Sequence, residues 1–373
     1  MNDVIKKKVS LITLQNVPNY GSVLQCYATE RIIKQLGYEV ETINYLPKRM
    51  TKIGMLYAIK NKSKLLKKSL IARNAARVII FPSYLKRFHT FNMFRKQYLN
   101  QSKKIYFDNN SLINDVPNAD IYCTGSDQVW NSEWNGGIDK ALFLDFVPKG
   151  KKCIAYSASF GKSKLDDWEI PETKILLKKY SNITLREKSG VEILEELGIE
   201  SKLAVDPTFL LTGDEWRSIS SKKNYKEKYI FVYNLNRNKK IDVYASNLSK
   251  KTGLKIKYLS YQFHEFFKKG KMYCNPKVED FINLIDNAEF VITDSFHATA
   301  FSINFNTPFV IVYPGKYGTR LQSILKITGL ENRVAQDEND LDVVKRKIDF
   351  GKVNKIINIE RQKSLSLLKE SLK

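Results

Sequence analysis

The segment 290–310 carries the side chains best suited to acid–base chemistry. An apolar run ends at Thr293, three polar residues follow it, and a run of small and apolar residues begins directly afterwards. This order predicts a buried strand, a turn and the start of a helix. The polar side chains of that turn are Asp294, Ser295 and His297. Because free N–H groups and a positive dipole end gather at a helix start, we expect the turn to bind phosphate or carboxylate.

His297 is the candidate general acid of this segment. A bound anion would stabilise its imidazolium, so that the ring could protonate a departing phosphate near pH 7. The hydroxyls of Ser295 and Thr299 would add hydrogen bonds to the anion. The alternatives are structural: His297 packs at the helix start, and Asp294 caps the helix instead of serving as a general base.

An anionic substrate also needs fixed cations. Arg186 is the best placed, because it ends a short predicted strand and a guanidinium matches the geometry of a carboxylate. Pairing of Arg186 with Glu187 or Asp206 is the structural alternative. Three further cations are weaker candidates for the same role: Lys188, Lys316 and Arg320.

Three more polar segments directly follow predicted strands, at 16–28, 124–131 and 156–162. In the first, Gly21 lets the backbone approach a ligand. The second combines a carboxylate, amides and an aromatic ring, as many carbohydrate sites do. The third favours a phosphate loop or an ordinary turn, and a plain β–α turn is the alternative for the first. The candidate sugar-contacting residues are Asn19, Tyr20, Gly21, Ser22, Gln25, Ser126, Gln128, Trp130, Asn131, Ser157 and Ser159.

The elements that position these residues alternate between strand and helix patterns along both halves of the chain. We expect strands at 9–14, 40–45, 121–124, 153–157, 183–186, 203–205, 229–233, 255–259, 290–293 and 308–312. This alternation predicts an α/β protein with two Rossmann-like, doubly wound domains facing a cleft, as in the GT-B architecture. We place the boundary near residue 206. Residues 1–205 would form the acceptor side and 206–373 the donor, phosphate side, with a final helix at 352–373 packing back on the N-terminal domain.

Positive charge is concentrated in one part of the chain. The net charge is +23, and the stretch between Glu41 and Asp108 has no acidic residue but sixteen Lys and Arg. We expect a basic helical insertion at about 48–104, whose interleaved apolar residues are typical of helices at anionic lipid surfaces. A solvated helical face is the alternative, and the absence of a nucleic-acid motif argues against DNA or RNA.

The remaining composition narrows the class of protein. No run of about 18 apolar residues occurs, so we expect no membrane-spanning helix, and the run 9–14 is too short for a signal peptide. The four cysteines lie far apart, with no histidine at ligand spacing, which argues against zinc, iron–sulfur clusters and disulfides. We therefore expect a protein of the cytoplasm without a metal, peripheral to the inner face of the cell membrane.

Six short blocks together resemble the polysaccharide pyruvyl transferase family. They are NYGSVLQ at 19–25, TGSDQVWN at 124–131, YSASFG at 156–161, LREKSG at 185–190, DPTFLL at 206–211 and TDSFH at 293–297. Their order and spacing match across roughly residues 10–335. The resemblance implies a GT-B-like fold and transfer of a pyruvyl group from phosphoenolpyruvate, as co-substrate without a cofactor, to two hydroxyls of a sugar. The products would be a cyclic ketal and phosphate.

The resemblance also implies roles for individual residues. His297 would be the acid, and Asp127 or Asp294 would orient or deprotonate the acceptor. Some members have Arg-Leu-His where this chain has Ser295-Phe-His, so the histidine carries over and the arginine does not. Arg186, with Lys188 or Arg320, would then hold the donor. The family suggests bacterial capsule, exopolysaccharide or cell-wall synthesis, with an acceptor carried on a polyprenyl diphosphate.

Two other functions compete with this one. A glycosyltransferase with a nucleotide-sugar donor would use the same scaffold, because a fold does not fix the chemistry. A non-enzymatic, basic module for anionic polymers would depend on the charge of 48–104 and not on His297.

Overall fold

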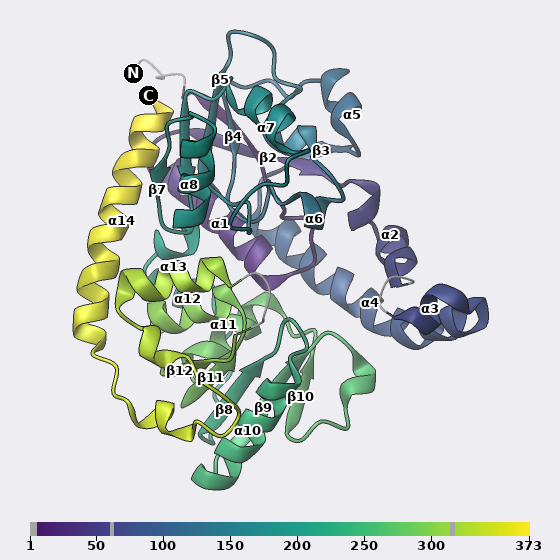
Figure 1. Ribbon diagram of the computed structural model, residues 1–373, viewed down its shortest axis with the longest axis vertical. Coiled ribbons are helices and arrows are strands. Elements are labelled where there is room, and N and C mark those ends of the chain that lie inside the picture. Colours follow the sequence, from purple (N-terminus) through teal and green to yellow (C-terminus); the bar gives the residue numbers. More distant parts are fainter. Residues whose placement is uncertain (1–5, 60–62, 314–317) are drawn as a thin grey trace.

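The computed structural model describes residues 6–59, 63–313 and 318–373. The chain forms two α/β halves, each built on a parallel sheet (Figure 1). The seven-stranded sheet has the order β3-β2-β1-β4-β5-β6-β7, and the five-stranded sheet has the order β10-β9-β8-β11-β12. All strand pairs within the two sheets are parallel. The expected α/β class with two doubly wound sheets is confirmed.

The strands of the first sheet are β1 (Lys8–Ile12), β2 (Glu39–Tyr45), β3 (Gln101–Tyr106), β4 (Ile121–Thr124), β5 (Lys152–Ala158), β6 (Asn182–Leu185) and β7 (Lys202–Leu203). Those of the second are β8 (Tyr229–Tyr233), β9 (Lys255–Ser260), β10 (Lys271–Cys274), β11 (Phe290–Thr293) and β12 (Phe309–Ile311). The central strands are continuous apolar runs, as in β8, where every residue is buried. Helices cover both faces of such sheets, which is why their strands do not alternate between apolar and polar residues.

Helices cover both faces of the first sheet. Apolar residues of α1 (Tyr20–Gln35) and α4 (Leu70–Tyr98) join one core with β1. On the other face, α7 (Ile170–Leu177) and α8 (Lys188–Glu196) pack against a second core. Two short helices complete this half: α5 (Asn109–Ile113) and α6 (Ser132–Asn135).

The second sheet is covered in the same way. One face packs against α10 (Lys239–Thr252). The opposite face carries α11 (Val278–Asp286) and α12 (Phe296–Phe305), whose apolar residues belong to the same core as those of α1. The halves therefore share one continuous apolar core. The remaining helices of this half are α9 (Gly213–Ile219), α13 (Thr319–Thr328) and α14 (Phe350–Leu372).

The last helix, α14, runs alongside both halves (Figure 1), and just beyond its end the carbonyl of Lys373 accepts a hydrogen bond from Nζ of Lys7 at 3.4 Å. Near its end the hydroxyl of Tyr38 donates to the carbonyl of Leu372 at 2.9 Å. At mid-length Ser364 accepts a hydrogen bond from the backbone N–H of Val205. The segment expected as a helix from 352 begins two residues earlier, with Asp349 as its N-cap.

The basic segment, residues 48–104, is not one surface insertion. Its outer helices are α2 (Lys52–Tyr57), α3 (Lys64–Lys68) and the first turns of α4, which project from the body of the molecule (Figure 1). There Ile71 is 85% exposed and Val78 is 73% exposed. The inner part of α4 buries Phe91 and Phe94 in the core. Among the described helices, none combines the length and apolarity needed to cross a lipid bilayer.

The inner part of α4 also joins the two halves. Thr90 donates its hydroxyl to the carbonyl of Asn275 at 3.1 Å. Arg87 donates to the carbonyl of Pro18 at 2.7 Å and lies over the ring of Tyr261, 3.9 Å from the ring centroid. These contacts fix the β1–α1 loop against the second half.

Candidate active site

A cluster of five ionisable side chains lies where the carboxyl ends of strands from the two halves meet. Asp127, Arg186 and Asp206 follow β4, β6 and β7, whereas His297 and Arg320 belong to the first turns of α12 and α13. We call these five residues the charged cluster. Carboxyl ends of parallel strands lie on one edge of a sheet, which is where α/β proteins bind ligands.

Arg186 is at the centre of the charged cluster and is fully buried. One terminal nitrogen, Nη1, donates to Oδ2 of Asp206 at 2.6 Å, and Nη2 lies 3.4 Å from Oδ1 of Asp127. The guanidinium also lies over the ring of Phe296, 4.9 Å from its centroid. Pairing with Asp206 is the structural alternative that the sequence left open. Two carboxylates already occupy the guanidinium, so the geometry does not support the prediction that Arg186 binds a donor carboxylate.

Asp127 has a strained backbone and a dense set of partners. Its φ of 77° lies in the left-handed region, which non-glycine residues seldom adopt. Ser22 donates to its Oδ2 at 2.7 Å, and Nη1 of Arg320 lies 3.7 Å from its Oδ1. Burial raises the pKa of Asp127, but the positive charges around it, that of Arg186 above all, hold it well below its usual range. Asp127 is therefore a fixed anion and not a neutral acid.

Asp206 is the second fixed anion. The backbone N–H and hydroxyl of Thr208 donate to its Oδ1, and Ser126 donates to its Oδ2 at 3.2 Å. Burial acts to raise its pKa, but the charge of Arg186 outweighs burial and lowers it. The sequence marked Asp206 only as a pairing partner, although it lies three residues beyond the end of β7, just as Asp127 lies three residues beyond the end of β4.

His297 is buried in the cluster with one ring nitrogen unused. Its Nε2 lies 3.8 Å from Oδ2 of Asp206 and forms no hydrogen bond with any described residue. Burial lowers the pKa of His297 to about 4, against the opposing charges of Asp206 and Asp127. The protein alone therefore keeps the imidazole neutral at pH 7, and the imidazolium expected from the sequence requires the added charge of an anion.

Gly21 explains how an element of the first half comes so close to this histidine. A Cβ at Gly21 would lie 1.9 Å from Nδ1 of His297, inside van der Waals contact. The glycine thus permits close packing of α1 against α12. The sequence predicted that Gly21 lets the backbone approach a ligand, whereas the group that it approaches in the structure is the ring of His297.

Arg320 is the cation of the cluster with the fewest partners. Its side chain is 12% exposed, its Nε, like that of Arg186, forms no hydrogen bond with any described residue, and its contact with Asp127 is 3.7 Å long. Burial and then the charge of Arg186 lower the pKa of Arg320 to about 10, so that it stays charged at pH 7. Arg320 is the cluster cation best able to accept an additional anion.

The polar side chains of the turn that starts α12 form hydrogen bonds within the protein. Ser295 is the N-cap and accepts from the N–H of Ala298, while Thr299 donates to the carbonyl of Ser295. Asp294 accepts hydrogen bonds from the N–H groups of Leu235 and Asn236. The structure therefore gives Asp294 a backbone-fixing role, and nothing in its contacts supports the general base expected from the sequence.

Several residues expected to contact sugar are instead structural. The ring of Tyr20 stacks on Phe281 and its hydroxyl donates to the carbonyl of Pro276. Trp130 is buried against Phe143, and its indole N–H donates to the carbonyl of Leu142. Both aromatic rings lie in the core, where the large apolar area of the ring is removed from water. The prediction that Tyr20 and Trp130 contact a sugar is therefore wrong.

The amides of the same segments also bond within the protein. Asn19 caps α1 and Asn131 caps α6. Gln128 accepts from Asn131 at 2.7 Å, and Gln25 donates to Thr13 and to the carbonyl of Ser22. Only Gln128 and Asn19 of these four keep partial exposure, so they are the two still accessible to a ligand.

The two hydroxyls predicted to bind sugar near the end of β5 are those of Ser157, within the strand, and Ser159, directly after it. Ser159 donates to Glu187, which also accepts the N–H of Gly161, so this loop is closed on itself. Ser157 has a positive φ of 51°, and its hydroxyl oxygen forms no hydrogen bond with any described residue. The structure offers no phosphate-binding loop there. Of the hydroxyls proposed to bind sugar, Ser22 and Ser126 are those that contact the charged cluster.

Two predicted cations lie elsewhere. The side chain of Lys188 is 73% exposed and pairs with Glu192 one turn along α8. In the first turn of α8 the side chain of Lys188 therefore points to solvent and not to the charged cluster. Lys316 lies outside the described residues.

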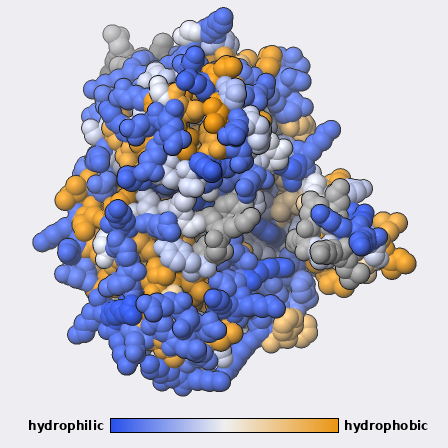
Figure 2. Space-filling view, viewed as in Figure 1, coloured by the Kyte–Doolittle hydropathy of each residue, from blue (hydrophilic) through white to orange (hydrophobic). Residues whose placement is uncertain are grey.

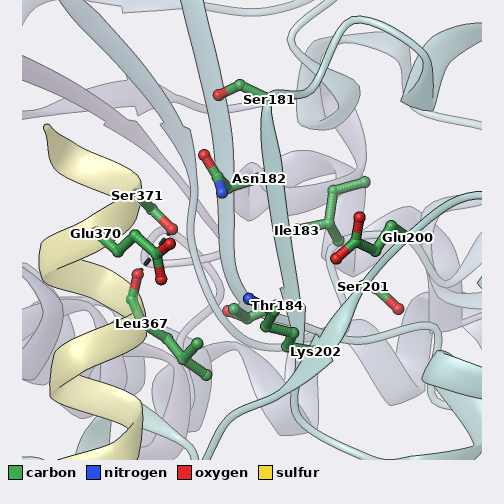
Figure 3. Close-up of a pocket in the computed structure, with 10 residues that line it drawn as sticks. All are labelled: Ser181, Asn182, Ile183, Thr184, Glu200, Ser201, Lys202, Leu367, Glu370 and Ser371. Atoms are coloured by element: carbon green, nitrogen blue, oxygen red, sulfur yellow. Dashed lines mark hydrogen bonds between the residues drawn. The ribbon is translucent and has the colours of Figure 1, made fainter.

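Two of the cavities among the described residues lie outside the charged cluster. The smaller, of about 90 Å³, lies between α14 and the amino-terminal ends of β6 and β7 (Figure 3). Its position at the amino edge of a parallel sheet and its size, below the 300–1,000 Å³ usual for ligand sites, make it unsuitable as an active site. The larger, of about 580 Å³, lies at the carboxyl ends of β1 and β2.

Comparison with known proteins identifies the chain. The family model described as polysaccharide pyruvyl transferase matches residues 19–316, which include four of the five residues of the charged cluster, all but Arg320. The chain belongs to the polysaccharide pyruvyl transferase family. This pyruvyl transferase is therefore a transferase enzyme, and its family implies a sugar acceptor. A comparison with curated protein sequences gives no match.

Solved structures similar to this pyruvyl transferase show its fold. The S. aureus MnaA–UDP co-structure aligns with a TM-score of 0.52 at 12% identity, covering 91% of this chain and 86% of that one. The UDP-GlcNAc 2-epimerase from Neisseria meningitidis bound to UDP-GlcNAc aligns with a TM-score of 0.51 at 10% identity, covering 98% and 99%. The expected GT-B-like fold is confirmed, and at these identities the likeness extends to the fold alone.

Proposed function

We propose that this pyruvyl transferase moves the pyruvyl group of phosphoenolpyruvate to two hydroxyls of a sugar in a lipid-linked precursor of a cell-surface glycan. The observation that supports this most directly is His297, whose Nε2 is buried and free of hydrogen bonds with described residues, at the start of α12 and beside Arg320. A helix start and a weakly paired arginine attract an anion, and the imidazole next to them handles a proton.

The reaction balances with these groups. A proton adds to C3 of phosphoenolpyruvate to form the methyl group, and one sugar hydroxyl bonds to C2 and loses its proton. The second hydroxyl then bonds to C2, the C2–O bond to phosphate breaks, and phosphate leaves with the remaining proton. Two hydroxyl protons are thus consumed, one by the methyl group and one by phosphate. No electrons are exchanged with another reagent.

In this proposal each residue of the charged cluster has a distinct part. The donor's negative charges raise the pKa of His297 from its low value, because an anion favours the charged ring. The imidazolium then delivers the proton, and Arg320 supplies the cation that other family members place at the position of Ser295. Asp127 and Asp206 fix the two arginines and the histidine, and Asp127 with Ser22 faces the acceptor hydroxyl.

Phosphate release tests this proposal. The protein is incubated with phosphoenolpyruvate and a set of free and lipid-linked oligosaccharides, and phosphate and ketal are measured together. His297→Gln should lower the rate by about 10²–10⁴-fold, whereas His264→Gln, at an exposed position, should leave it unchanged. If His297→Gln forms phosphate and ketal at the wild-type rate, the proposed chemistry is wrong.

A nucleotide-sugar donor is the second candidate. The two structural neighbours bind UDP or UDP-GlcNAc according to their descriptions, and the same edge of the sheets binds ligand in GT-B proteins. The same incubation separates the two functions when it is run with nucleotide sugars in place of phosphoenolpyruvate. Turnover with a nucleotide sugar alone would replace the pyruvyl-transfer proposal.

We further propose that the outer part of the basic segment binds an anionic lipid surface. Exposed Ile53, Ile71 and Val78 accompany the lysines of α2–α4, and apolar and hydrophilic residues mingle on this projection in Figure 2. Each basic residue at such a surface contributes about 1 kcal/mol. Such binding would hold the enzyme at the cytoplasmic face of the membrane, beside a polyprenyl-linked acceptor.

Vesicle sedimentation tests the membrane proposal. Phosphatidylserine-containing vesicles should bind the wild type, and Lys67→Glu with Lys68→Glu should weaken that binding by tenfold or more. The control is Lys352→Glu with Lys355→Glu on α14, which changes the net charge equally at another exposed face. Equal losses in both double variants would reduce the effect to net charge and remove the proposed surface.

A further inference from the structure

The larger cavity, which we call the Arg95 pocket, is built at the carboxyl ends of β1 and β2 and covered by the inner part of α4. Its volume is about 580 Å³, within the range of small-molecule sites. Its polar lining includes Asn16, Asn44, Asn92, Gln101 and Arg95. No Asp or Glu is among the residues that line it.

Arg95 is the feature that gives the pocket a specificity. It is only 8% exposed. Its Nη1 donates a long hydrogen bond of 3.4 Å to the carbonyl of Gln15, and no carboxylate of a described residue pairs with it. A buried charge without a counter-charge is costly, and the usual remedy in proteins is an anion. The guanidinium therefore favours a ligand with a carboxylate or a phosphate.

The other lining groups favour a sugar. Asn92 is exposed at the pocket and Gln101 reaches it from β3, so both amides can bond to hydroxyls. Asn16 and Asn44 are held in place by a hydrogen bond between their side chains at 2.9 Å. Lys52 adds a second cation and lies 5.9 Å from the ring centroid of Phe88. Amides around a cationic centre match the hydroxyls and the charge of an anionic sugar.

The pocket and the charged cluster flank the same loop. Asn16 lines the pocket, while Gly21 and Ser22, a few residues further along, contact His297 and Asp127. The strands on either side of β1 in the sheet are β2, which contributes Asn44 to the pocket, and β4, which precedes Asp127 of the cluster. The strand order reverses between β1 and β4, and α/β proteins form their clefts at such switch points.

From these observations we infer that the Arg95 pocket binds the acceptor through a negatively charged group attached to the sugar. That the ligand is the acceptor rests on the proposed function, whereas the binding of an anionic sugar in this pocket does not. The charge has two sources with the same chemistry: the phosphate of a glycosyl phosphate, as in a lipid carrier, and the carboxylate of an acidic sugar. Exposed Ile53 and Leu85 also line the pocket and connect it with the exposed apolar residues of the outer basic segment.

Direct binding tests the inference without turnover. Glucose 1-phosphate, glucuronate and glucose are titrated into the protein by calorimetry or ligand-observed NMR, without phosphoenolpyruvate. At least one of the two anionic probes should bind ten times or more tightly than glucose. Preference for glucose 1-phosphate would assign the charge to a glycosyl phosphate, and preference for glucuronate would assign it to an acidic sugar. Equal affinity for all three probes would overturn the inference.

Variants locate the binding. Arg95→Gln should weaken the preferred anionic probe by about tenfold or more, and Lys96→Gln, an exposed neighbour on α4 with the same loss of charge, should not. Because Arg95 is buried, Asn92→Asp supplies a second test at an exposed position and should also weaken the anion. Unchanged affinity in both Arg95→Gln and Asn92→Asp would overturn the inference.

The outcome is separable from that of the proposed function. Phosphoenolpyruvate binding, measured in the same variants, should be unchanged, because the charged cluster does not include Arg95. Anionic-sugar binding that depends on Arg95, together with absence of any ketal product, would keep the pocket and remove the pyruvyl-transfer chemistry. Ketal formation with anionic and neutral acceptors at equal rates would keep the chemistry and remove the pocket.

Discussion

The charged cluster and the outer part of the basic segment both concentrate cations, but they hold them in opposite ways. In the cluster, Arg186 and Arg320 face Asp127; Arg186 is buried and Arg320 is 12% exposed. In the basic segment no acidic residue occurs between Glu41 and Asp108, and Lys52, Lys67 and Lys68 are exposed. Removing a charge from the first region breaks a buried network, whereas removing one from the second changes only a long-range field.

The largest expected effect is that of Arg186→Gln. The substitution leaves Asp206 and Asp127 buried without their main partner, and such losses cost about 3–5 kcal/mol. Urea unfolding of the purified variant measures this cost. Arg217→Gln is the matched control: Arg217 also pairs with carboxylates, Asp286 and Asp214, but is 42% exposed, so we expect about 1 kcal/mol or less. Equal losses of stability in the two variants would show that burial of the cluster does not set the cost of removing an arginine.

The next largest effect should be a change of stability with pH, which arises in the charged cluster. The folded protein holds the pKa of His297 at about 4, below the value of about 6.5 in the unfolded chain. Between these values the unfolded state binds the proton and the folded state does not, so stability falls as pH falls from 7 to 5, by about 2 kcal/mol. The carboxylates of the cluster contribute below this window, because their unfolded pKa values are near 4.

Urea unfolding of the wild type and of His297→Gln at pH 7 and pH 5 measures this difference. His89 and His264 are present in both proteins and cancel in the comparison. The wild type should lose about 2 kcal/mol more than the variant. Identical pH dependence of the two proteins would mean that the imidazole is not held neutral.

Gly21→Ala tests the contact between α1 and α12. Its Cβ would lie 1.9 Å from Nδ1 of His297, so the histidine must move, and overpacking of this kind costs about 1–3 kcal/mol. The rate of phosphate release should fall further than the loss of stability alone explains, because the imidazole is displaced. Gly190→Ala, where the added Cβ meets nothing closer than 3.5 Å, should change neither quantity by a comparable amount. Wild-type activity in Gly21→Ala would exclude this positioning role.

The smallest expected effect on stability belongs to the basic segment. Lys67→Gln with Lys68→Gln should change the free energy of unfolding by no more than about 0.5 kcal/mol, because both side chains are exposed and no ion pair is broken. Calorimetric or urea unfolding at low and high salt checks this. A loss comparable with that of Arg186→Gln would contradict the division of the molecule into a packed cluster and a solvated charged surface.

Local patterns predicted the elements of this protein well. Strands such as β8 and β11 are short apolar runs, and their ends were placed within a residue or two because polar residues follow at once. The same rule located the charged cluster, since Asp127, Arg186 and His297 all follow strand ends. Carboxyl ends of parallel strands meet at one edge, so the rule carries spatial information.

The direction of each side chain was predicted less well. Tyr20 and Trp130 follow strand ends as the cluster residues do, yet both rings lie in the core. An aromatic ring satisfies a sugar face or an apolar core equally, and local sequence does not distinguish them. For Asp294 the local sequence did not distinguish a catalytic from a structural role. Its hydrogen bonds come from Leu235 and Asn236, in a loop about 60 residues earlier.

The sequence by itself determined the class of fold, the order of the elements, the excess of positive charge and the residue types of the site, because these depend on local periodicity and composition. Only the tertiary structure decided that Asp206 pairs with Arg186, that His297 is neutral, and that Arg95 faces a pocket. Each of these facts depends on groups distant in sequence. The cost of burying a charge is set by all the groups that surround it, which no local pattern contains.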